Sequence, residues 1–196
     1  MSRPAKLTLF LSAAGLLLIL LAAGGYHHYR SQTAHLRLFD EYFDARPAGG
    51  YGVPRALVSP LKPAAVADQD ASILRQAIAY HQTGEFAGAL AASRAWLESN
   101  PAPRDHRAHL LGATAAVEVG EYATARALLD DLPQGEPALG LERDYYLGLL
   151  DVYEGELARA ATRLERVAQA GLGFRRGRAV ALLERVRALA AARGRG

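Results

Sequence analysis

A six-residue pattern that occurs three times constrains the fold of this chain more than any other feature. It reads GEFAGA at residues 84–89, GEYATA at 120–125 and GELARA at 155–160. The copies begin 36 and 35 residues apart, a spacing typical of stacked repeat units. Glycine permits the left-handed residue that ends a helix, the acidic residue suits the positive start of the next helix, and alanine allows close packing. Each copy therefore predicts the turn of a helical hairpin, and we expect an all-α fold.

The hairpins resemble the tetratricopeptide repeat (TPR) family, whose 34-residue unit combines a small first-helix residue, this turn, a following alanine and a late proline. Residues matching these features are Ala77, Ala113 and Gly148 in the first helices, Ala89, Ala125 and Ala160 after the turns, and Pro101 and Pro137 at the ends of two units, with Leu172 in the third such place. The resemblance covers residues 70–173 and implies an α-solenoid of three repeats.

The chain departs from the family pattern at two positions of the first helices. Ile73, His109 and Asp144 stand at the fourth position, and Tyr80, Ala116 and Asp151 at the eleventh. We expect irregular packing there. A polar pair between His109 and Asp144 is one interpretation, and a shifted helix that exposes both side chains is the one we favour.

Residues 174–196 are predicted to form a capping helix followed by a basic tail. The apolar residues Ala179, Leu182, Leu183, Val186 and Leu189 lie on one helical stripe, which would close the open end of the solenoid. A basic patch is expected on this segment, made of Arg175, Arg176, Arg178, Arg185, Arg187, Arg193 and Arg195.

The N-terminal segment is predicted to anchor the chain in a membrane. Residues 1–6 form a basic flank with Arg3 and Lys6, and nineteen uncharged residues follow from Leu7 to Gly25. As a helix they would span about 28 Å, enough for the hydrocarbon core. We assign a transmembrane helix to residues 7–26, with a cleaved signal peptide as the alternative. We expect a single-pass protein of the bacterial inner (cytoplasmic) membrane, with its C-terminal domain in the periplasm.

Two segments are expected between the membrane and the repeats. Residues 27–45 are predicted to hold a juxtamembrane amphipathic helix, with Leu38, Phe39, Tyr42 and Phe43 near one face. That helix is expected to pack on the main domain or on the membrane surface. Residues 46–69 are rich in Pro and Gly and are predicted to form an extended connector.

No residue pattern in the chain points to catalysis, and we expect neither an enzyme nor a cofactor. The chain lacks cysteine, a phosphate-binding glycine loop and a nucleophile elbow. His106 and His109 have a spacing that a metal could use, near Asp105, but no third ligand can be named, so no metal is predicted. His27 and His28 are interpreted as interfacial residues.

The resemblance also implies which residues line the concave face of the repeats. They are Leu74, Ile78 and His81 in the first unit, Arg107, Leu110, Thr114 and Val117 in the second, and Glu142, Tyr145, Leu149 and Val152 in the third. Leu74, Leu110 and Tyr145 replace the Lys and Asn of chaperone-binding members, so a carboxylate clamp is not expected. An apolar groove suits a peptide or helix, with Tyr145 as an exposed anchor. An alternative is that residues 48–67 fold back into the groove.

These observations leave two functions of different classes. The first is a membrane-tethered protein-interaction scaffold whose groove binds a peptide or helix of an unidentified protein partner. The alternative is binding of a polyanion or anionic lipid by the Arg-rich C-terminal helix. We do not expect nucleic acid to be the partner.

Overall fold

The computed structural model describes residue 29 and residues 33–44, 67–100, 106–132, 137–170 and 175–194. Every regular element in these ranges is an α-helix, which confirms the all-α prediction. The helices are α2 (Ala34–Tyr42), α3 (Ala67–Thr83), α4 (Phe86–Ser99), α5 (Arg107–Glu118), α6 (Tyr122–Asp130), α7 (Pro137–Tyr153), α8 (Leu157–Gln169) and α9 (Arg175–Arg193).

The predicted membrane segment is not among these residues. A search of the described helices finds none with the length and apolar character needed to cross a bilayer. The segment 7–26 and its flank 1–6 lie outside the described residues, as does nearly all of the predicted connector. The helix α3 already begins at Ala67, within the stretch that we assigned to the connector.

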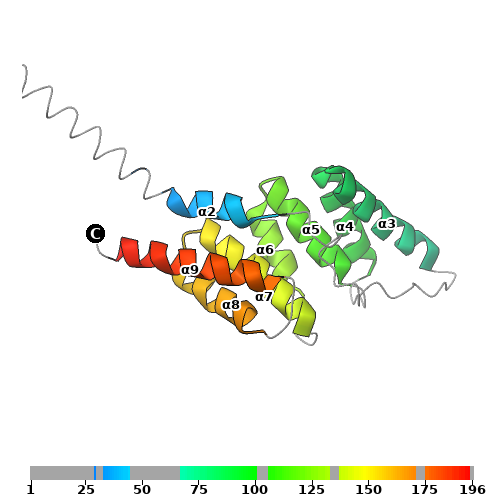
Figure 1. The fold of residues 1–196 in the computed structure, drawn as a ribbon. Coiled ribbons are helices and arrows are strands. Elements are labelled where there is room, and N and C mark those ends of the chain that lie inside the picture. Colours follow the sequence, from blue (N-terminus) through cyan, green and yellow to red (C-terminus); the bar gives the residue numbers. More distant parts are fainter. Residues whose placement is uncertain are drawn as a thin grey trace, which may run out of the picture.

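Each helix from α3 to α9 packs against the next one in the chain (Figure 1). The helices α3 and α4, α5 and α6, and α7 and α8 form three successive hairpins, and α9 packs against α8 and α7. The helix α2 does not join this sequence but packs against α7 and α9. The described part of the chain is therefore a row of hairpins with a single helix at its C-terminal end and α2 laid against the last units.

The three turns have one backbone conformation, as the recurring hexamer predicts. Gly84, Gly120 and Gly155 have φ values of 81°, 80° and 79°, in the region that glycine adopts without strain. In each turn the following glutamate N–H bonds the carbonyl five residues earlier, as in Glu121 N to Ala116 O at 2.7 Å. The same glutamate is the N-cap of the next helix. This is a Schellman-type helix end, which satisfies carbonyls that the helix leaves free.

The small residues of the pattern lie where two helices approach closely. The alanines Ala77, Ala113, Ala89, Ala125 and Ala160 are buried. A Cβ atom added to Gly148 would lie 3.1 Å from Cγ of Leu164, so α7 and α8 have no room for a larger residue there. The predicted apolar stripe of α9 is also buried, except for the half-buried Leu189.

The first helices of the second and third hairpins are buried on all sides. Every residue from 108 to 117 in α5 and from 144 to 152 in α7 is buried. A helix that is enclosed in this way has neighbours around its whole circumference. For α7 those neighbours are α6, α8, α9 and α2.

Candidate interaction site

The helix α2 packs against α7 and α9, and its side chains also reach Tyr122 at the start of α6. The helix is amphipathic, with Leu38 and Phe39 buried and with exposed charges on its other face. It ends where Phe43 adopts an extended conformation. A nine-residue helix has little stability alone in water, so α2 must derive its helical structure from this contact.

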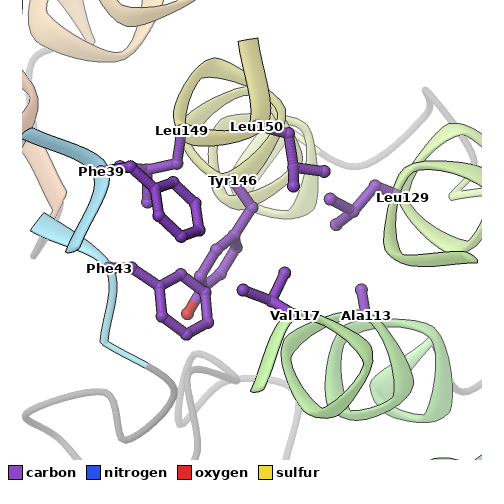
Figure 2. Close-up of a pocket in the computed structure, with 8 residues that line it drawn as sticks. All are labelled: Phe39, Phe43, Ala113, Val117, Leu129, Tyr146, Leu149 and Leu150. Carbon is purple, nitrogen blue, oxygen red and sulfur yellow. The ribbon is translucent and has the colours of Figure 1, made fainter. Parts of the chain in front are cut away.

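The apolar part of the contact is formed by two phenylalanine rings. Phe39 and Phe43 stack with ring centroids 5.4 Å apart and reach toward the space between α5 and α7 (Figure 2). The side chains that line this pocket from the repeats are Ala113, Val117, Leu129, Tyr146, Leu149 and Leu150. Phe39 also meets the rings of Tyr122 at 6.0 Å and Tyr153 at 5.3 Å, both edge-on. Thus α2 fills a gap that the helices of the repeats would otherwise leave.

A buried arginine supports the floor of this site. The Arg175 guanidinium lies 4.8 Å and 4.9 Å from the ring centroids of Tyr145 and Tyr146. Its Nε donates to Glu142 at 3.0 Å, and it also bonds the Tyr146 hydroxyl. Burial raises the pKa of Glu142, and the nearby Arg175 only partly opposes that effect. Arg175 therefore joins the start of α9 to Glu142, Tyr145 and Tyr146 of α7 and is not a surface cation.

Donors from α7 and α9 cap the C-terminal end of α2. The Tyr42 carbonyl accepts bonds from the Tyr145 hydroxyl at 3.2 Å and from Arg178 at 2.9 Å. Arg178 also pairs with Asp44 at 3.3 Å. Burial raises the pKa of Tyr145, which keeps the hydroxyl a neutral donor. The last carbonyls of a helix lack partners and carry partial negative charge, so these donors stabilise the end of α2.

Two further arginines of α9 hold the exposed side of α2. Arg185 forms an ion pair with Glu41, and its guanidinium lies 5.7 Å from the Tyr42 ring centroid. Arg193 donates to Nδ1 of His35 at 2.8 Å and to the Gly155 carbonyl at 3.4 Å. His35, near the start of α2, contacts Arg193 at the end of α9, and Tyr42, at the end of α2, contacts Arg178 near the start of α9, so the two helices run antiparallel.

The predicted groove residues do not form one open face but are divided between two apolar clusters. Leu74 and Ile78 pack with Trp96 and Leu111, whereas Leu110, Val117, Tyr145, Leu149 and Val152 belong to the larger cluster that also contains Leu38 and Phe39 of α2. Of the predicted set, Ile78, Arg107 and Glu142 are partly exposed, and Leu74, His81, Leu110, Thr114, Val117, Tyr145, Leu149 and Val152 are buried. The expectation of an exposed Tyr145 is therefore wrong, because that side chain is 0% exposed. Its hydroxyl meets α2, whereas the alternative occupant that we named was residues 48–67. In the first unit, His81 bonds the Thr114 hydroxyl at 2.9 Å.

The predicted basic patch is not one continuous cationic surface. Arg175 is buried, Arg178 and Arg185 contact α2, and Arg193 reaches both His35 and Gly155. Arg187 pairs with Glu165 at 2.9 Å, and Arg176 donates to the Ala168 carbonyl at 3.3 Å. Arg195 lies outside the described residues. The surplus of arginine therefore serves largely to bind other parts of the domain.

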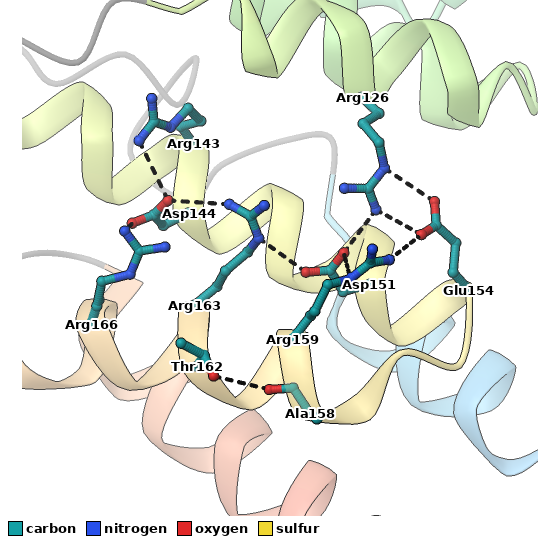
Figure 3. Close-up of polar contacts among 10 residues, drawn as sticks. All are labelled: Arg126, Arg143, Asp144, Asp151, Glu154, Ala158, Arg159, Thr162, Arg163 and Arg166. Atoms are coloured by element: carbon teal, nitrogen blue, oxygen red, sulfur yellow. Dashed lines mark hydrogen bonds and ion pairs between the residues drawn. The ribbon is translucent and has the colours of Figure 1, made fainter.

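The sequence did not indicate the ion-pair network that joins α6, α7 and α8 (Figure 3). Asp151 is fully buried and contacts Arg126 at 2.9 Å, Arg163 at 3.0 Å and Arg159 at 3.5 Å. Asp144 lies about two turns before Asp151 on α7. It contacts Arg166 at 3.1 Å and, at longer distances, Arg143 and Arg163. The available signal was the matched spacing of Asp144 and Asp151 on one helix and Arg159, Arg163 and Arg166 on the next.

Arginines compensate the buried charges of Asp144 and Asp151 in this network. The expectation of a shifted helix that exposes His109 and Asp144 is wrong, since both residues are buried. The network fixes α7 in place and so positions Tyr145, Tyr146 and Leu149 under α2.

The histidines that we considered as metal ligands lie at the start of α5. The ring centroids of His106 and His109 are 5.9 Å apart. Among the residues with described positions, no group of three or more potential ligands is found. Burial lowers the pKa of His109, helped by the nearby His106 and opposed by Asp131. Asp105, His27 and His28 lie outside the described residues.

Comparison of the chain with protein-family models, with curated protein sequences and with solved structures gave no match. The interpretation of the site therefore depends on its own geometry.

Proposed function

We propose that this protein is a membrane-tethered interaction module of TPR-like hairpins that binds a helix of a partner protein where α2 docks. Three features support a repeat architecture: the equal turns at Gly84, Gly120 and Gly155, the buried alanines that follow them, and the single helix α9 at the end. The proposal does not assign catalysis, since the site contains tyrosine and arginine contacts that hold a helix.

The observation that carries the proposal is the docked helix α2. The site offers three kinds of contact to a helix: a pocket for aromatic rings, donors for the carbonyl end, and arginines for acidic side chains. Helix-in-groove recognition uses the same combination of apolar anchors on one face with polar contacts at the rim. A surface that holds α2 in this way has the chemistry to hold a helix from another protein.

The tether is proposed from residues 7–26. Their apolar length suits a membrane span, and α2 begins soon after this segment ends. In this arrangement the repeats lie close to the bilayer, which we propose to be the bacterial inner membrane, with the repeats on its periplasmic side. The partner would then be a membrane protein or a protein that works at the membrane surface.

The test of this function compares partner capture by a closed and an open site. Because the chain has no cysteine, Glu41→Cys/Arg185→Cys can be joined specifically by a short bis-maleimide, which locks α2 in place. The full-length protein is purified from bacterial membranes with and without the lock, and captured proteins are identified by mass spectrometry. We expect the lock to reduce capture of a specific partner at least tenfold.

A matched control separates the lock from the labelling. The same Glu41→Cys/Arg185→Cys protein, labelled with a monofunctional maleimide that cannot join the two positions, should capture at least as much partner as the unlabelled double variant. Equal recovery from locked and unlocked protein would contradict the proposed function. Recovery that is independent of the lock but lost as salt rises would instead support binding of an anionic ligand by the arginines, because such contacts are screened.

A further inference from the structure

The docked α2 shows what kind of helix the site selects, and this inference rests on the proposed function. Leu38 and Phe39 are buried in the main core cluster, and Tyr42 and Phe43 pack against it, so four apolar side chains hold α2 and the residue after it. Its ion pair with Arg185 is about half exposed on both sides, at 49% and 53%. Exposed ion pairs contribute little to binding energy. The contact is therefore specific in its geometry and depends on few apolar side chains.

We propose that α2 is an internal competitor that occupies the site until a partner helix of the same chemistry replaces it. The partner segment carries one aromatic residue in the helix and a second just after the helix ends, in the places of Phe39 and Phe43. It also carries one carboxylate in the last turn of the helix and one beyond it, in the places of Glu41 and Asp44. The first pair fills the gap between α5 and α7, and the carboxylates meet Arg185 and Arg178.

Release of α2 changes the surface of the domain in a defined way. It uncovers the apolar lining formed by Val117, Leu129, Tyr146 and Leu149 and their neighbours. Exposed apolar surface of this kind marks an interaction site. It also frees the hydroxyl of Tyr145 and the guanidinium of Arg178 from the Tyr42 carbonyl. Both groups are then available to cap the end of the incoming helix.

The competition has a quantitative consequence. A site that is open only part of the time binds its ligand more weakly, in proportion to the open fraction. Loosening α2 must therefore tighten the binding of a helix supplied separately. Locking α2 must abolish that binding.

The probe for this test is a fluorescent peptide of residues 33–44, TAHLRLFDEYFD. Its binding to the full-length protein in detergent is measured by fluorescence anisotropy. The protein variants are the wild type, Leu38→Ala/Phe39→Ala, and the Glu41→Cys/Arg185→Cys protein with its bis-maleimide lock. We expect the Ala variant to bind the peptide at least tenfold more tightly than the wild type, and the locked protein not to bind it.

Control peptides test the chemistry of the helix. A peptide with Phe39→Ala should lose binding at least tenfold, and one with Glu41→Gln/Asp44→Asn should bind more weakly and with less dependence on salt. A second open variant, Glu41→Lys/Asp44→Lys, reverses only surface charges on α2 and leaves the aromatic side chains in place. It should also bind the wild-type peptide more tightly than the wild-type protein does.

Several results would overturn the proposal. The first is failure of the peptide to bind either open variant. The second is binding of the peptide to the locked protein as tightly as to the open variants. The third is loss of folding in both open variants, which would show that α2 is a fixed part of the core. A covalent dimer formed from a mixture of Glu41→Cys and Arg185→Cys proteins would identify a second copy as the occupant instead. In each case lock-dependent capture of a partner would leave the proposed function standing, so the two failures are distinguishable.

Discussion

Replacing Phe39 by Ala should release α2 while the repeats stay folded. Phe39 is 4% exposed and its ring meets those of Phe43, Tyr122 and Tyr153. Removing a buried Phe side chain costs about 3–5 kcal/mol in a protein core. The lower end of about 3 kcal/mol is appropriate here, because the site opens to solvent when α2 leaves. That loss lowers the equilibrium constant for docking of α2 by roughly a hundredfold.

The consequence depends on how strongly α2 is held. Ordering each of its residues opposes docking by about 1–2 kcal/mol, so the net docking energy must be much smaller than the gross contact energy. A loss of about 3 kcal/mol is therefore expected to leave α2 mostly undocked. The seven helices from α3 to α9 keep their own contacts and the ion pairs of Asp151.

Hydrogen exchange measured by mass spectrometry separates these outcomes. In Phe39→Ala, amides of residues 34–42 should exchange like an unfolded segment, while those of α7 and α8 stay protected. The control is Tyr29→Ala, which removes an aromatic side chain that is 63% exposed and should change nothing. A parallel loss of protection in α2, α7 and α8 would refute the reasoning, since it would make α2 part of one cooperative core.

Three further predictions concern the repeats and are tested by chemical denaturation. Asp151→Asn should lower the free energy of unfolding by about 2 kcal/mol, because charged hydrogen bonds to a buried carboxylate are lost, whereas Glu121→Gln, in an exposed pair, should change it much less. Gly120→Ala should lower the free energy of unfolding by about 1–2 kcal/mol. The whole effect would come from the positive φ, since a Cβ there meets no atom within 4 Å. An unchanged denaturation midpoint would contradict the shared turn geometry. Because the folded state lowers the pKa of His109, the unfolded chain binds the proton more readily, so stability should fall as pH drops below about 6.5, and His109→Gln should remove that part of the pH dependence.

The sequence predicted the local elements of the fold well because their causes are local. A glycine with positive φ, an acidic N-cap and a small packing residue each act within one turn or one helix pair, as at Gly120, Glu121 and Ala125. The apolar stripe of α9 likewise follows from helical periodicity alone. These features predict hairpins without any knowledge of their neighbours.

The site could be predicted only in part because it depends on contacts between distant segments. Periodicity showed that α2 has an apolar face, but it could not tell whether that face meets lipid or the repeats. The arginines of α9 are equally ambiguous: Arg175 is buried against two tyrosines and Arg187 is exposed, although both are simply basic residues in the sequence. The burial of Asp144 was not predicted either, because the arginine that pairs with it most closely, Arg166, lies on another helix.

The central claim is that α2 docks against α7 and α9 and leaves this site when a helix of like chemistry binds. Pulsed electron paramagnetic resonance tests it directly with spin labels on Arg37→Cys and Glu98→Cys, both exposed positions in a chain without native cysteine. In the full-length protein alone, we predict one narrow distance distribution that corresponds to docked α2. Excess peptide of residues 33–44 should replace it by a broad distribution, whereas a distribution that stays narrow at saturating peptide, or is broad from the start, would contradict the account.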